Sequence, residues 1–539
     1  MERPLKKIVL VAMLIMSAGW VSAKVRLPAL FSCGMVLQQG VRIPVWGWGV
    51  AGESVEVCFG TQVQKTKVDA AGKWMLHLHP EQASAESRIL KIQVGAEVNE
   101  ITNVLVGEVW ICSGQSNMDF ELGKLCNRKL RTKASKPIVD YMKKMLTTAD
   151  DPLFRQIAVP HLVSVWNEKE DFVGHWITSS PENNTDFSAT AYFFGLELRR
   201  ELQVPVGLIK CAWGGTRVEA WIPMEAYRKT ESLKDYYEAE MTSLNRRLEQ
   251  WGNPQKAQAK YDAELAKWKG KTEGMKKKPR KPRKRDNPKT NKQLPAGLYN
   301  GMIHPLIPFA FKGVIWYQGE SNEHYFPKEY SKRFMAAIQG WRNAWGRGDF
   351  PFYYVQLANY HAPHNNPDES SLAFICNQQR LALALKNTGM AVINDIGEAK
   401  DIHPKNKIDV GKRLARLALS RDYGRSDIVG SGPLYQSHTI EGSKIIISFS
   451  SVGDGLMTGK KKLLDSVVET DELPGGFQIR GIDRKWRWGD AKIVDKNKVE
   501  VSCADIEHPT AVRYAWASNP TNANLYNKEG LPTSVFTTE

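Results

Sequence analysis

GEVWICSGQSNM, residues 107–118, decides the fold, because a run typical of a buried strand ends abruptly in polar residues. Trp110, Ile111 and Cys112 form the apolar run, and residues 113–117 then present hydroxyl and amide groups. A serine placed among amide donors and acceptors suits a nucleophile, but it also suits an ordinary polar turn. The rest of the chain has to distinguish between the two.

Strand-like and helix-like segments alternate between residues 105 and 425. The strand-like runs are 204–213, 311–319, 350–358 and 389–397, and the helix-like runs are 190–203, 325–345, 378–386 and 410–420. Such alternation predicts a largely parallel sheet with helices on both faces. The predicted fold class is therefore α/β.

The two ends of the chain have a different pattern. Residues 24–104 contain short β-type runs separated by turn residues, which predicts a small β-sandwich. We predict an N-terminal β domain (24–104), an α/β domain (105–425) and a C-terminal β segment (426–539). A helix-rich insertion at about 225–295 interrupts the α/β domain.

Residues 1–23 have the composition of a secretory signal. Three basic residues (Arg3, Lys6 and Lys7) precede an apolar run, and Val21-Ser22-Ala23 forms a small-residue cleavage site. A membrane anchor is the alternative, but the apolar run is short for a span, and no later stretch is long and apolar enough. We expect export to the periplasm or the exterior.

The seven cysteines are scattered and include no CxxC pair. One or two disulfides are compatible with an exported protein, but the sequence does not assign their pairing. Since no metal-ligand spacing occurs, we expect no metal.

The formal net charge of +16 is concentrated in one segment. Residues 267–292 carry an excess of +11 and the signal segment carries +2, which leaves only +3 elsewhere. The run is punctuated by proline and contains a single aromatic residue, so it predicts a solvated insertion rather than a nucleic-acid site. Contact with an anionic surface is the alternative, and no part in the chemistry is expected.

Polar residues follow three predicted strands of the same sheet. They lie at 114–117, 211–216 and 316–322, and Asp401-Ile402-His403-Pro404 follows a fourth strand. Ligands of parallel sheets bind at the carboxyl ends of the strands. Each piece alone is more often structural, but serine, histidine, an acid and amide donors together fit acyl transfer. Met118 breaks the G-x-S-x-G pattern, which disfavours the α/β-hydrolase elbow.

Four blocks resemble those of sialate O-acetylesterases, within the SGNH-type serine esterases that also include acetylxylan esterases. The blocks are GEVWICSGQSNM, CAWGGTRVEAWIP, GVIWYQGESN and DIHPKNKIDVGKRLA, and the terminal VRYAWASNPTNANLYNKEGLPTSVF is also similar. The resemblance implies a flavodoxin-like SGNH core, one β-sandwich-type accessory domain built from both chain ends, and no cofactor. It also implies removal of O-acetyl groups from sugars, foremost 9-O-acetyl sialate. The basic insertion departs from the family pattern.

Matching the motifs residue by residue implies roles for five residues. Ser116 would be the nucleophile and His403 the general base. The N–H groups of Ser116 and Gly215 would form the oxyanion hole, with Gln318 as third donor or Asn322 in its place.

Four further residues are expected to contact the substrate: Gln115, Asn117, Arg217 and Glu320. Arg217 is a possible partner for the sialate carboxylate, since guanidinium binds carboxylate in a bidentate manner. A structural salt bridge, for instance to Glu219, is an equal alternative.

Asp401 is the predicted acid that orients His403. Pro404 biases His403 toward an extended backbone, and side chains two apart in an extended segment point the same way. The other candidate acids are Asp395, Glu398 and Glu320. In a further alternative, a backbone carbonyl replaces the acid.

Other functions remain open at this point. Trp46, Trp48 and Trp486 would suit a carbohydrate-binding protein without catalysis, although such tryptophans more often lie in a core. A peptidase or lipase would share the nucleophile, and xylan or other plant glycans would be alternative substrates. The oligomeric state is not indicated.

Overall fold

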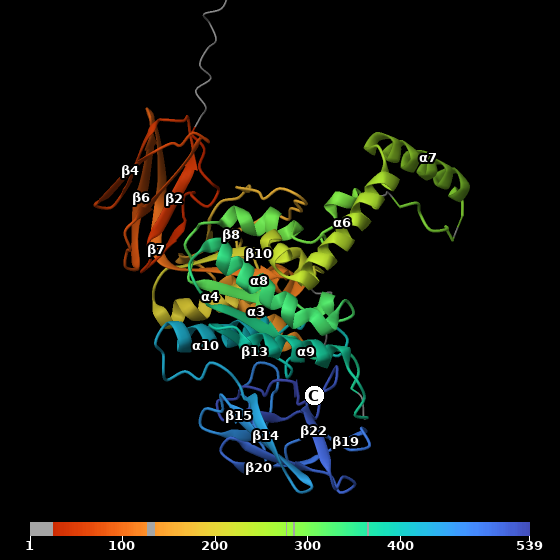
Figure 1. The fold of residues 1–539 in the computed structure, drawn as a ribbon. Helices are drawn as coiled ribbons and strands as arrows, with labels where there is room; N and C mark the ends of the chain where they lie inside the picture. The colour runs from red at the N-terminus through yellow and green to blue at the C-terminus, as the bar shows by residue number, and fades with distance from the viewer. Residues whose placement is uncertain (1–24, 127–134, 276, 284–285, 364–365) are drawn as a thin grey trace, which may run out of the picture.

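The computed structural model describes residues 25–126, 135–275, 277–283, 286–363 and 366–539 (Figure 1). The predicted signal segment lies outside the described residues. A central α/β domain carries an N-terminal β unit at one end and a C-terminal β unit at the other, and a helical arm projects from its side (Figure 1).

The central sheet has the strand order β13-β12-β11-β7-β10-β8-β9. Its strands are β7 (Glu97–Gly114), β8 (Asp151–Ala158), β9 (Ile177–Ser179), β10 (Val206–Ala212), β11 (Gly313–Tyr317), β12 (Phe352–Gln356) and β13 (Thr388–Val392). All neighbours pair in parallel except the edge strand β9. The predicted α/β class with a largely parallel sheet is confirmed.

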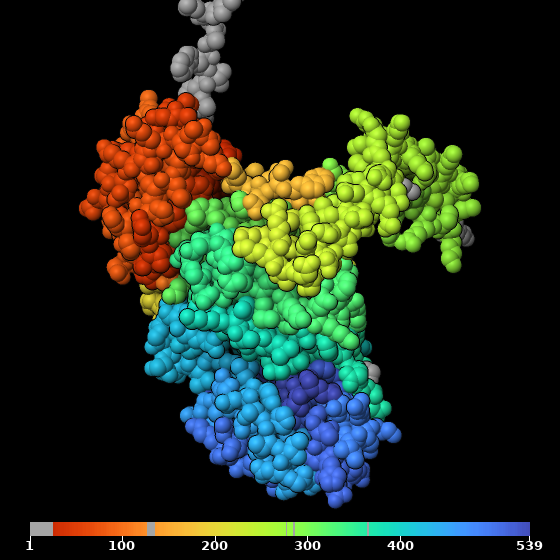
Figure 2. All heavy atoms as spheres, in the orientation of Figure 1, coloured from red at the N-terminus to blue at the C-terminus, as the bar shows by residue number. Residues whose placement is uncertain are grey.

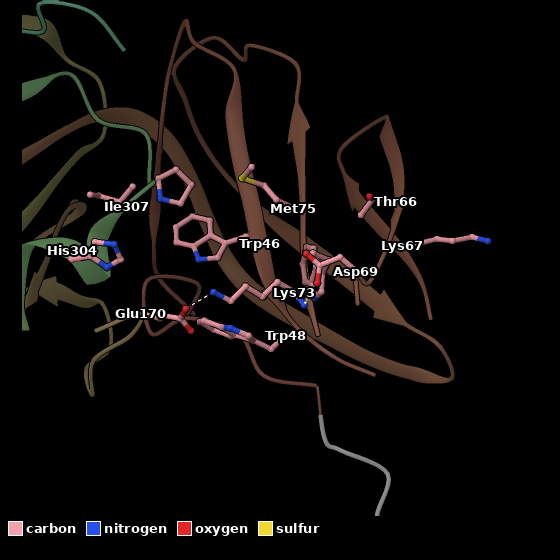
Figure 3. A pocket seen from close by; sticks show the side chains of 13 residues that line it. Trp46, Trp48, Thr66, Lys67, Asp69, Lys73, Met75, Glu170, His304 and Ile307 are labelled. Carbon is pink, nitrogen blue, oxygen red and sulfur yellow. Dashed lines mark hydrogen bonds and ion pairs between the residues drawn. The ribbon is translucent and has the colours of Figure 1, made fainter. Parts of the chain in front are cut away.

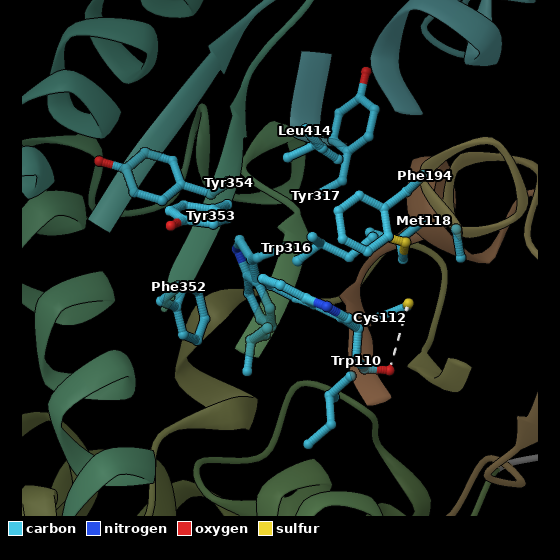
Figure 4. Close-up of a cluster of buried hydrophobic side chains, with 14 of the residues drawn as sticks. Trp110, Cys112, Met118, Phe194, Trp316, Tyr317, Phe352, Tyr353, Tyr354 and Leu414 are labelled. Carbon is cyan, nitrogen blue, oxygen red and sulfur yellow. Dashed lines mark hydrogen bonds between the residues drawn. The ribbon is translucent and has the colours of Figure 1, made fainter. Parts of the chain in front are cut away.

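Helices cover both faces of this sheet. On one face α4 (Ala189–Leu202) packs beside α10 (Lys407–Asp422), and on the other α8 (Tyr330–Trp345) packs near α9 (Ser371–Leu381). Trp110 of β7 meets Phe194 of α4 at a ring-centroid distance of 5.1 Å, whereas Trp316 of β11 meets Trp341 of α8 at 5.9 Å. Figure 4 shows the aromatic layer around Trp110 and Trp316. These large apolar side chains fix the sheet between its helices.

Helix boundaries follow local capping. The Ser188 side chain accepts the N–H of Ala191 at the start of α4, which ends at left-handed Gln203. Ser370 caps α9 in the same way, so this helix begins well before the predicted 378–386 and ends at Leu381. The remaining short helices of the central domain are α1 (Ser116–Asp119), α2 (Leu122–Leu125) and α3 (Lys136–Thr147).

Strand β7 connects the N-terminal unit to the central sheet. Its first part pairs with antiparallel β6, while its last part runs between β10 and β11. The N-terminal strands are β1 (Val36–Gln38), β2 (Ile43–Trp48), β3 (Ser54–Phe59), β4 (Gln62–Lys67), β5 (Lys73–Leu78) and β6 (Ser84–Val94). In β3 the alternation SVEVCF buries every second side chain, as expected of a half-buried strand.

The C-terminal strands form sheets of their own. They are β14 (Leu434–Glu441), β15 (Lys444–Ser450), β16 (Leu456–Lys460), β17 (Val468–Glu469), β18 (Phe477–Gly481), β19 (Trp486–Trp488), β20 (Asp490–Asp495), β21 (Lys498–Ser502), β22 (Pro509–Tyr514), β23 (Leu525–Asn527) and β24 (Phe536–Thr537). None of them pairs with a described N-terminal strand, and the two β units lie on opposite sides of the central domain (Figure 1). The expectation of one accessory domain from both chain ends is therefore wrong.

The insertion consists of α5 (Met224–Lys229), α6 (Glu231–Trp251) and α7 (Pro254–Thr272). Tyr227 of α5 and Leu233 and Leu244 of α6 are buried against the body, whereas the end of α6 and α7 form an arm that projects away from it (Figures 1 and 2). Thr272 is the one buried residue of α7, so most of this helix is not covered by other described residues. Among the described residues no helix is long and apolar enough to cross a membrane.

All seven cysteines are free, and Cys112 and Cys211 are buried within β7 and β10. The described residues contain no group of three or more His, Cys, Asp or Glu side chains that could hold a metal ion.

Candidate active site

A glycine ends β7 and places Ser116. Gly114 has φ +136°, and a Cβ atom there would collide with the Tyr317 carbonyl of neighbouring β11. Only glycine permits this close approach. The Gln115 N–H then donates to the Tyr317 carbonyl at 2.9 Å, and Ser116 begins α1 at the carboxyl edge of the sheet.

Ser116 and His403 meet at this edge. The Ser116 Oγ lies 2.9 Å from His403 Nε2, although the two residues are 287 positions apart in the chain. His403 lies in the loop between β13 and α10, and the Phe120 ring stands 5.7 Å from its imidazole ring. A hydroxyl in this position can donate to an unprotonated imidazole, which is the contact that a serine nucleophile needs.

Asp401 lies behind His403. Its Oδ1 is 3.5 Å from His403 Nδ1 and accepts the His403 backbone N–H at 2.9 Å. Its Oδ2 accepts from Lys405 Nζ at 2.5 Å. A tight turn of the backbone from Asp401 to His403 therefore places the carboxylate beside the imidazole. The predicted extended segment is not formed.

The rival acids are engaged elsewhere. Asp395 forms a nearly buried two-pronged ion pair with Arg413, at 2.6 and 2.8 Å. Glu398 accepts the backbone N–H of Lys405 at 2.8 Å. Glu320 accepts from the Asn117 amide at 2.6 Å. Of the four acids proposed, Asp401 is the one that the structure brings to His403.

A buried polar network joins the two loops that carry Ser116 and His403. The Asn117 Nδ2 donates to Glu320 and, at 3.1 Å, to the carbonyl of Ile402, and its Oδ1 accepts from Lys407. Asn117 is 1% exposed and Lys407 0%. Both N–H donors of the Asn117 amide are therefore used and its oxygen accepts from Lys407, so the expected contact with substrate is not met in this structure, and Asn117 links the two loops instead.

Burial and this network set the charges of the site. Burial lowers the pKa of Lys407 to about 7, against the attraction of Glu320. Burial also lowers the pKa of His403, and the Lys407 charge lowers it further, while Asp401 opposes both. Burial opposes ionisation of Asp401, but Lys405 and the His403 N–H outweigh it, so the pKa of Asp401 is lowered. His403 is thus kept in its neutral, proton-accepting form near pH 7.

Several backbone N–H groups near Ser116 have no acceptor within the described chain. Those of Ser116, Gly214 and Gly215 are among them. A Cβ atom on Gly214 would lie 3.3 Å from the Ser116 Cβ, so the Gly214–Gly215 loop passes directly beside the serine. Free N–H groups in this position can stabilise a developing oxyanion.

Gln318 and Asn322 do not supply a third donor. The Gln318 Nε2 donates to the Thr216 carbonyl at 3.1 Å and to Asn322 Oδ1 at 2.7 Å. The Asn322 Nδ2 in turn donates to both carboxylate oxygens of Glu219, at 3.2 and 3.0 Å. Both side chains are fully buried with their donors committed, so the expected oxyanion contacts are not met in this structure.

Comparison with known proteins identifies the family of this chain. The family described as carbohydrate esterase, sialic acid-specific acetylesterase, matches residues 106–259 and 292–420, more than half of the chain. The chain belongs to this family. Its resemblance to sialate O-acetylesterases is thereby confirmed, and it is a carboxylic ester hydrolase.

Individual relatives match over most of their length. Sialate O-acetylesterase of Homo sapiens is 27% identical over 523 residues, 90% of this chain and 86% of that protein. The Pongo abelii protein of the same name is 28% identical over equal shares. A crystal structure of a carbohydrate acetylesterase from Xanthomonas citri is 33% identical with a TM-score of 0.75, covering 96% of this chain and 99% of that one.

The other three residues expected to contact substrate are Gln115, Glu320 and Arg217, and the first two are engaged in contacts within this acetylesterase family member. Gln115 accepts the N–H groups of Gly319 and Ser321 through Oε1, which braces the loop after β11. Glu320 Oε1 accepts from the Asn117 amide, so this carboxylate belongs to the buried network around Asn117; its Oε2 lacks a partner in the described chain, and burial raises the pKa of Glu320.

Arg217 remains available. Its guanidinium carbon lies 3.3 Å from the centroid of the Tyr325 ring, and the side chain is half-buried. The alternative salt bridge to Glu219 does not form, because Glu219 pairs with Arg333 at 2.6 Å.

The tryptophans singled out for sugar binding lie far from this esterase site. Trp46 is 8% exposed and packs edge-on against Phe31. Trp48 carries the Arg26 guanidinium 3.6 Å from its ring centroid. Both line a cavity of about 470 Å³ beside the ion pair of Lys73 with Glu170 (Figure 3), whose lining includes neither active-site residue. Trp486 is similarly covered by Arg513 at 4.1 Å.

Several functional side chains were missed by sequence reasoning. Lys405 and Lys407 lie within the quoted block DIHPKNK, so their proximity to His403 was a usable signal. His161 stacks on Trp213 at 4.4 Å beside the Gly214 loop, and no local pattern pointed to it. Lys292, the last basic residue of the insertion, donates to the Gly214 carbonyl, so the expectation that the insertion has no part in the site is wrong at this residue.

Proposed function

We propose that this chain is an exported serine esterase that removes O-acetyl groups from sialic acid or a related sugar, foremost 9-O-acetyl sialate. The observation that carries the proposal is the 2.9 Å contact between Ser116 Oγ and His403 Nε2, beside the free N–H groups of Ser116, Gly214 and Gly215. Membership of the carbohydrate esterase family supports the acetyl ester as the bond cleaved.

In the first step, Ser116 Oγ attacks the acetyl carbonyl carbon while His403 Nε2 takes the hydroxyl proton. The carbonyl oxygen becomes an oxyanion, which the N–H groups of Ser116 and Gly215 stabilise. The bond between the acetyl carbonyl carbon and the sugar oxygen then breaks, and the proton on His403 passes to that oxygen as it leaves. The products of this step are the free sugar hydroxyl and acetyl-Ser116.

In the second step, His403 takes a proton from water, and the resulting hydroxide equivalent attacks the acetyl-serine carbonyl. Collapse of the second tetrahedral intermediate returns the proton to Ser116 Oγ and releases acetate. Asp401 stabilises the imidazolium in both steps through its charge 3.5 Å from Nδ1.

The substrate class rests on the family and on Arg217. The relatives are named sialate O-acetylesterases, and Arg217 follows the Gly214–Gly215 loop with its guanidinium unpaired by any described carboxylate. A guanidinium there suits the sialate carboxylate. The Xanthomonas citri relative is named only a carbohydrate acetylesterase, so another acetylated glycan, such as xylan, is the second candidate.

Acetate release from a panel of acetylated sugars tests the proposal. We expect 9-O-acetyl sialate to be turned over with a higher kcat/KM than acetylated xylose, and Ser116→Ala to abolish both. Equal or inverted preference would assign the second substrate class. Release from both substrates by the Ser116→Ala protein would reject the serine mechanism.

Export is proposed from the composition of residues 1–23 alone. Expression of the full chain and of a chain beginning at Lys24, followed by fractionation of cells, tests it. We expect only the full chain to reach the periplasm or the medium. Equal distribution of the two proteins would contradict export by this segment.

A further inference from the structure

The basic insertion ends directly at the proposed oxyanion loop. Its last residue, Lys292, donates from Nζ to the Gly214 carbonyl, and a Cβ atom on Gly215 would lie 3.3 Å from the same Nζ. Gly214 borders Ser116 instead, since a Cβ atom on Gly214 would lie 3.3 Å from the Ser116 Cβ. The loop is thus held between Lys292 on one side and Ser116 on the other.

This arrangement fixes the direction of one N–H group. In a trans peptide the carbonyl of one residue and the N–H of the next point in opposite directions. Because the Gly214 carbonyl points at Lys292, the Gly215 N–H points away from Lys292, on the side of the loop where Ser116 lies. That N–H has no acceptor within the described chain.

The next residue holds the other half of the loop. Gln293 Nε2 donates to the Gly215 carbonyl at 2.6 Å, and Gln293 Oε1 accepts the Arg217 N–H at 2.9 Å. Gly215 has φ +68°, a left-handed conformation, and the loop forms no ladder with a neighbouring strand. Two consecutive side chains from the end of the insertion therefore set both carbonyls of the loop.

We propose that Lys292 and Gln293 are positioning residues that orient the Gly215 N–H toward the oxyanion formed at Ser116. The ammonium group also polarises the Gly214–Gly215 peptide, because a hydrogen bond accepted at a carbonyl strengthens the donor on the same amide. The proposal rests on the serine mechanism given above.

Lys292→Met tests the inference, with Lys289→Met as the matched control. Lys289 belongs to the same basic run but lies over the Trp166 ring, 4.5 Å from its centroid, and contacts neither glycine of the loop. Loss of a whole oxyanion donor costs about 10²- to 10³-fold in kcat, so misorientation of one should cost about 10- to 100-fold. We expect that loss in Lys292→Met with KM nearly unchanged, and wild-type kcat in Lys289→Met.

Two further measurements distinguish a misoriented Gly215 N–H from general disruption of the active site. A boronic acid forms a tetrahedral adduct with the serine, so its affinity should fall by the same factor as kcat, while the acidic limb of the pH profile stays in place. Lys292→Arg, which keeps a cationic donor, should recover most of the activity. Gln293→Leu should also lower kcat and boronate affinity together, which provides a second test if Lys292→Met folds poorly.

The possible failures are distinguishable. If Lys292→Met and Gln293→Leu keep the kcat of Lys289→Met while Ser116→Ala is inactive, the positioning role is wrong and the serine mechanism stands. If kcat falls but boronate affinity does not, the residues act elsewhere than on the oxyanion. If Ser116→Ala itself retains turnover, the mechanism and this inference fail together.

Discussion

Replacing Asp401 by asparagine removes one charge from behind His403 and leaves the turn intact. The amide oxygen can still accept the His403 backbone N–H, which Asp401 Oδ1 now accepts at 2.9 Å. In the Ser-His-Asp template the same change costs about 10⁴-fold in kcat. Here Oδ1 stands 3.5 Å from Nδ1, beyond the roughly 3.2 Å limit of a good hydrogen bond, and Oδ2 is held by Lys405.

We therefore expect a smaller loss, about 10²-fold in kcat, which corresponds to about 2.7 kcal/mol of transition-state stabilisation. Asp401 also raises the pKa of His403, so its loss should move the acidic limb of kcat/KM to lower pH. Steady-state hydrolysis of a chromogenic acetyl ester between pH 4 and 9, on protein shown to be folded by circular dichroism, measures both effects.

Asp395→Asn is the matched control for this experiment. It makes the same chemical change six residues away, where the carboxylate pairs with Arg413. Leaving that arginine buried and unpaired should cost about 3–5 kcal/mol of stability, with kcat retained in the folded protein. Near-native kcat in Asp401→Asn would refute the reasoning and favour a dyad oriented by a backbone carbonyl.

Three further outcomes are expected. Lys407→Met should move the acidic limb of kcat/KM to higher pH, opposite to Asp401→Asn, because the Lys407 charge lowers the pKa of His403; an unmoved limb in the pH–rate profile would contradict this. Replacing residues 273–286 by a Gly-Ser linker should leave turnover of a small acetyl ester within a few-fold, since Lys292 is spared; a collapse of activity in a folded protein would show that the rest of the segment shapes the site. Arg217→Ala should reduce the kcat/KM preference for acetyl-sialate over acetyl-xylose, and an unchanged ratio would remove Arg217 from substrate recognition.

The sheet and the position of Ser116 could be predicted because their signals are local. Apolar runs of strand length separated by amphipathic helices specify a parallel sheet, and polar residues after such runs must gather at one edge. The pairing of Ser116 with His403 follows from that topology, across 287 positions of sequence.

The hydrogen bonds within the site could not be predicted in the same way. Gln318 and Asn322 lie in the expected block, but their donors turn inward to Thr216 and Glu219, which only the packing of β11 against the neighbouring loop decides. The sequence predicts an extended backbone between Asp401 and His403, whereas a turn brings the carboxylate to the imidazole. The sequence predicts which of these residues lie near the site, but it does not predict where their side chains point.

The contact of Lys292 and the separation of the two β units could not be predicted from the sequence. Most described residues of the basic segment are exposed, and nothing in its composition distinguishes Lys292 from its neighbours. Two β-rich chain ends are equally compatible with one shared domain and with two separate units, because strand pairing between distant segments leaves no periodic signal. The structure has two units.

The most direct test of the account is to find where the acetyl group goes during turnover. Acid quenching of the protein within its first turnovers of a chromogenic acetyl ester, followed by peptide mass spectrometry, locates it. The account predicts one acetyl group on Ser116 in the wild-type protein, and neither acetylation nor acetate release in Ser116→Ala. Continued acetate release by Ser116→Ala, or an acetyl group carried by another residue in its place, would contradict it.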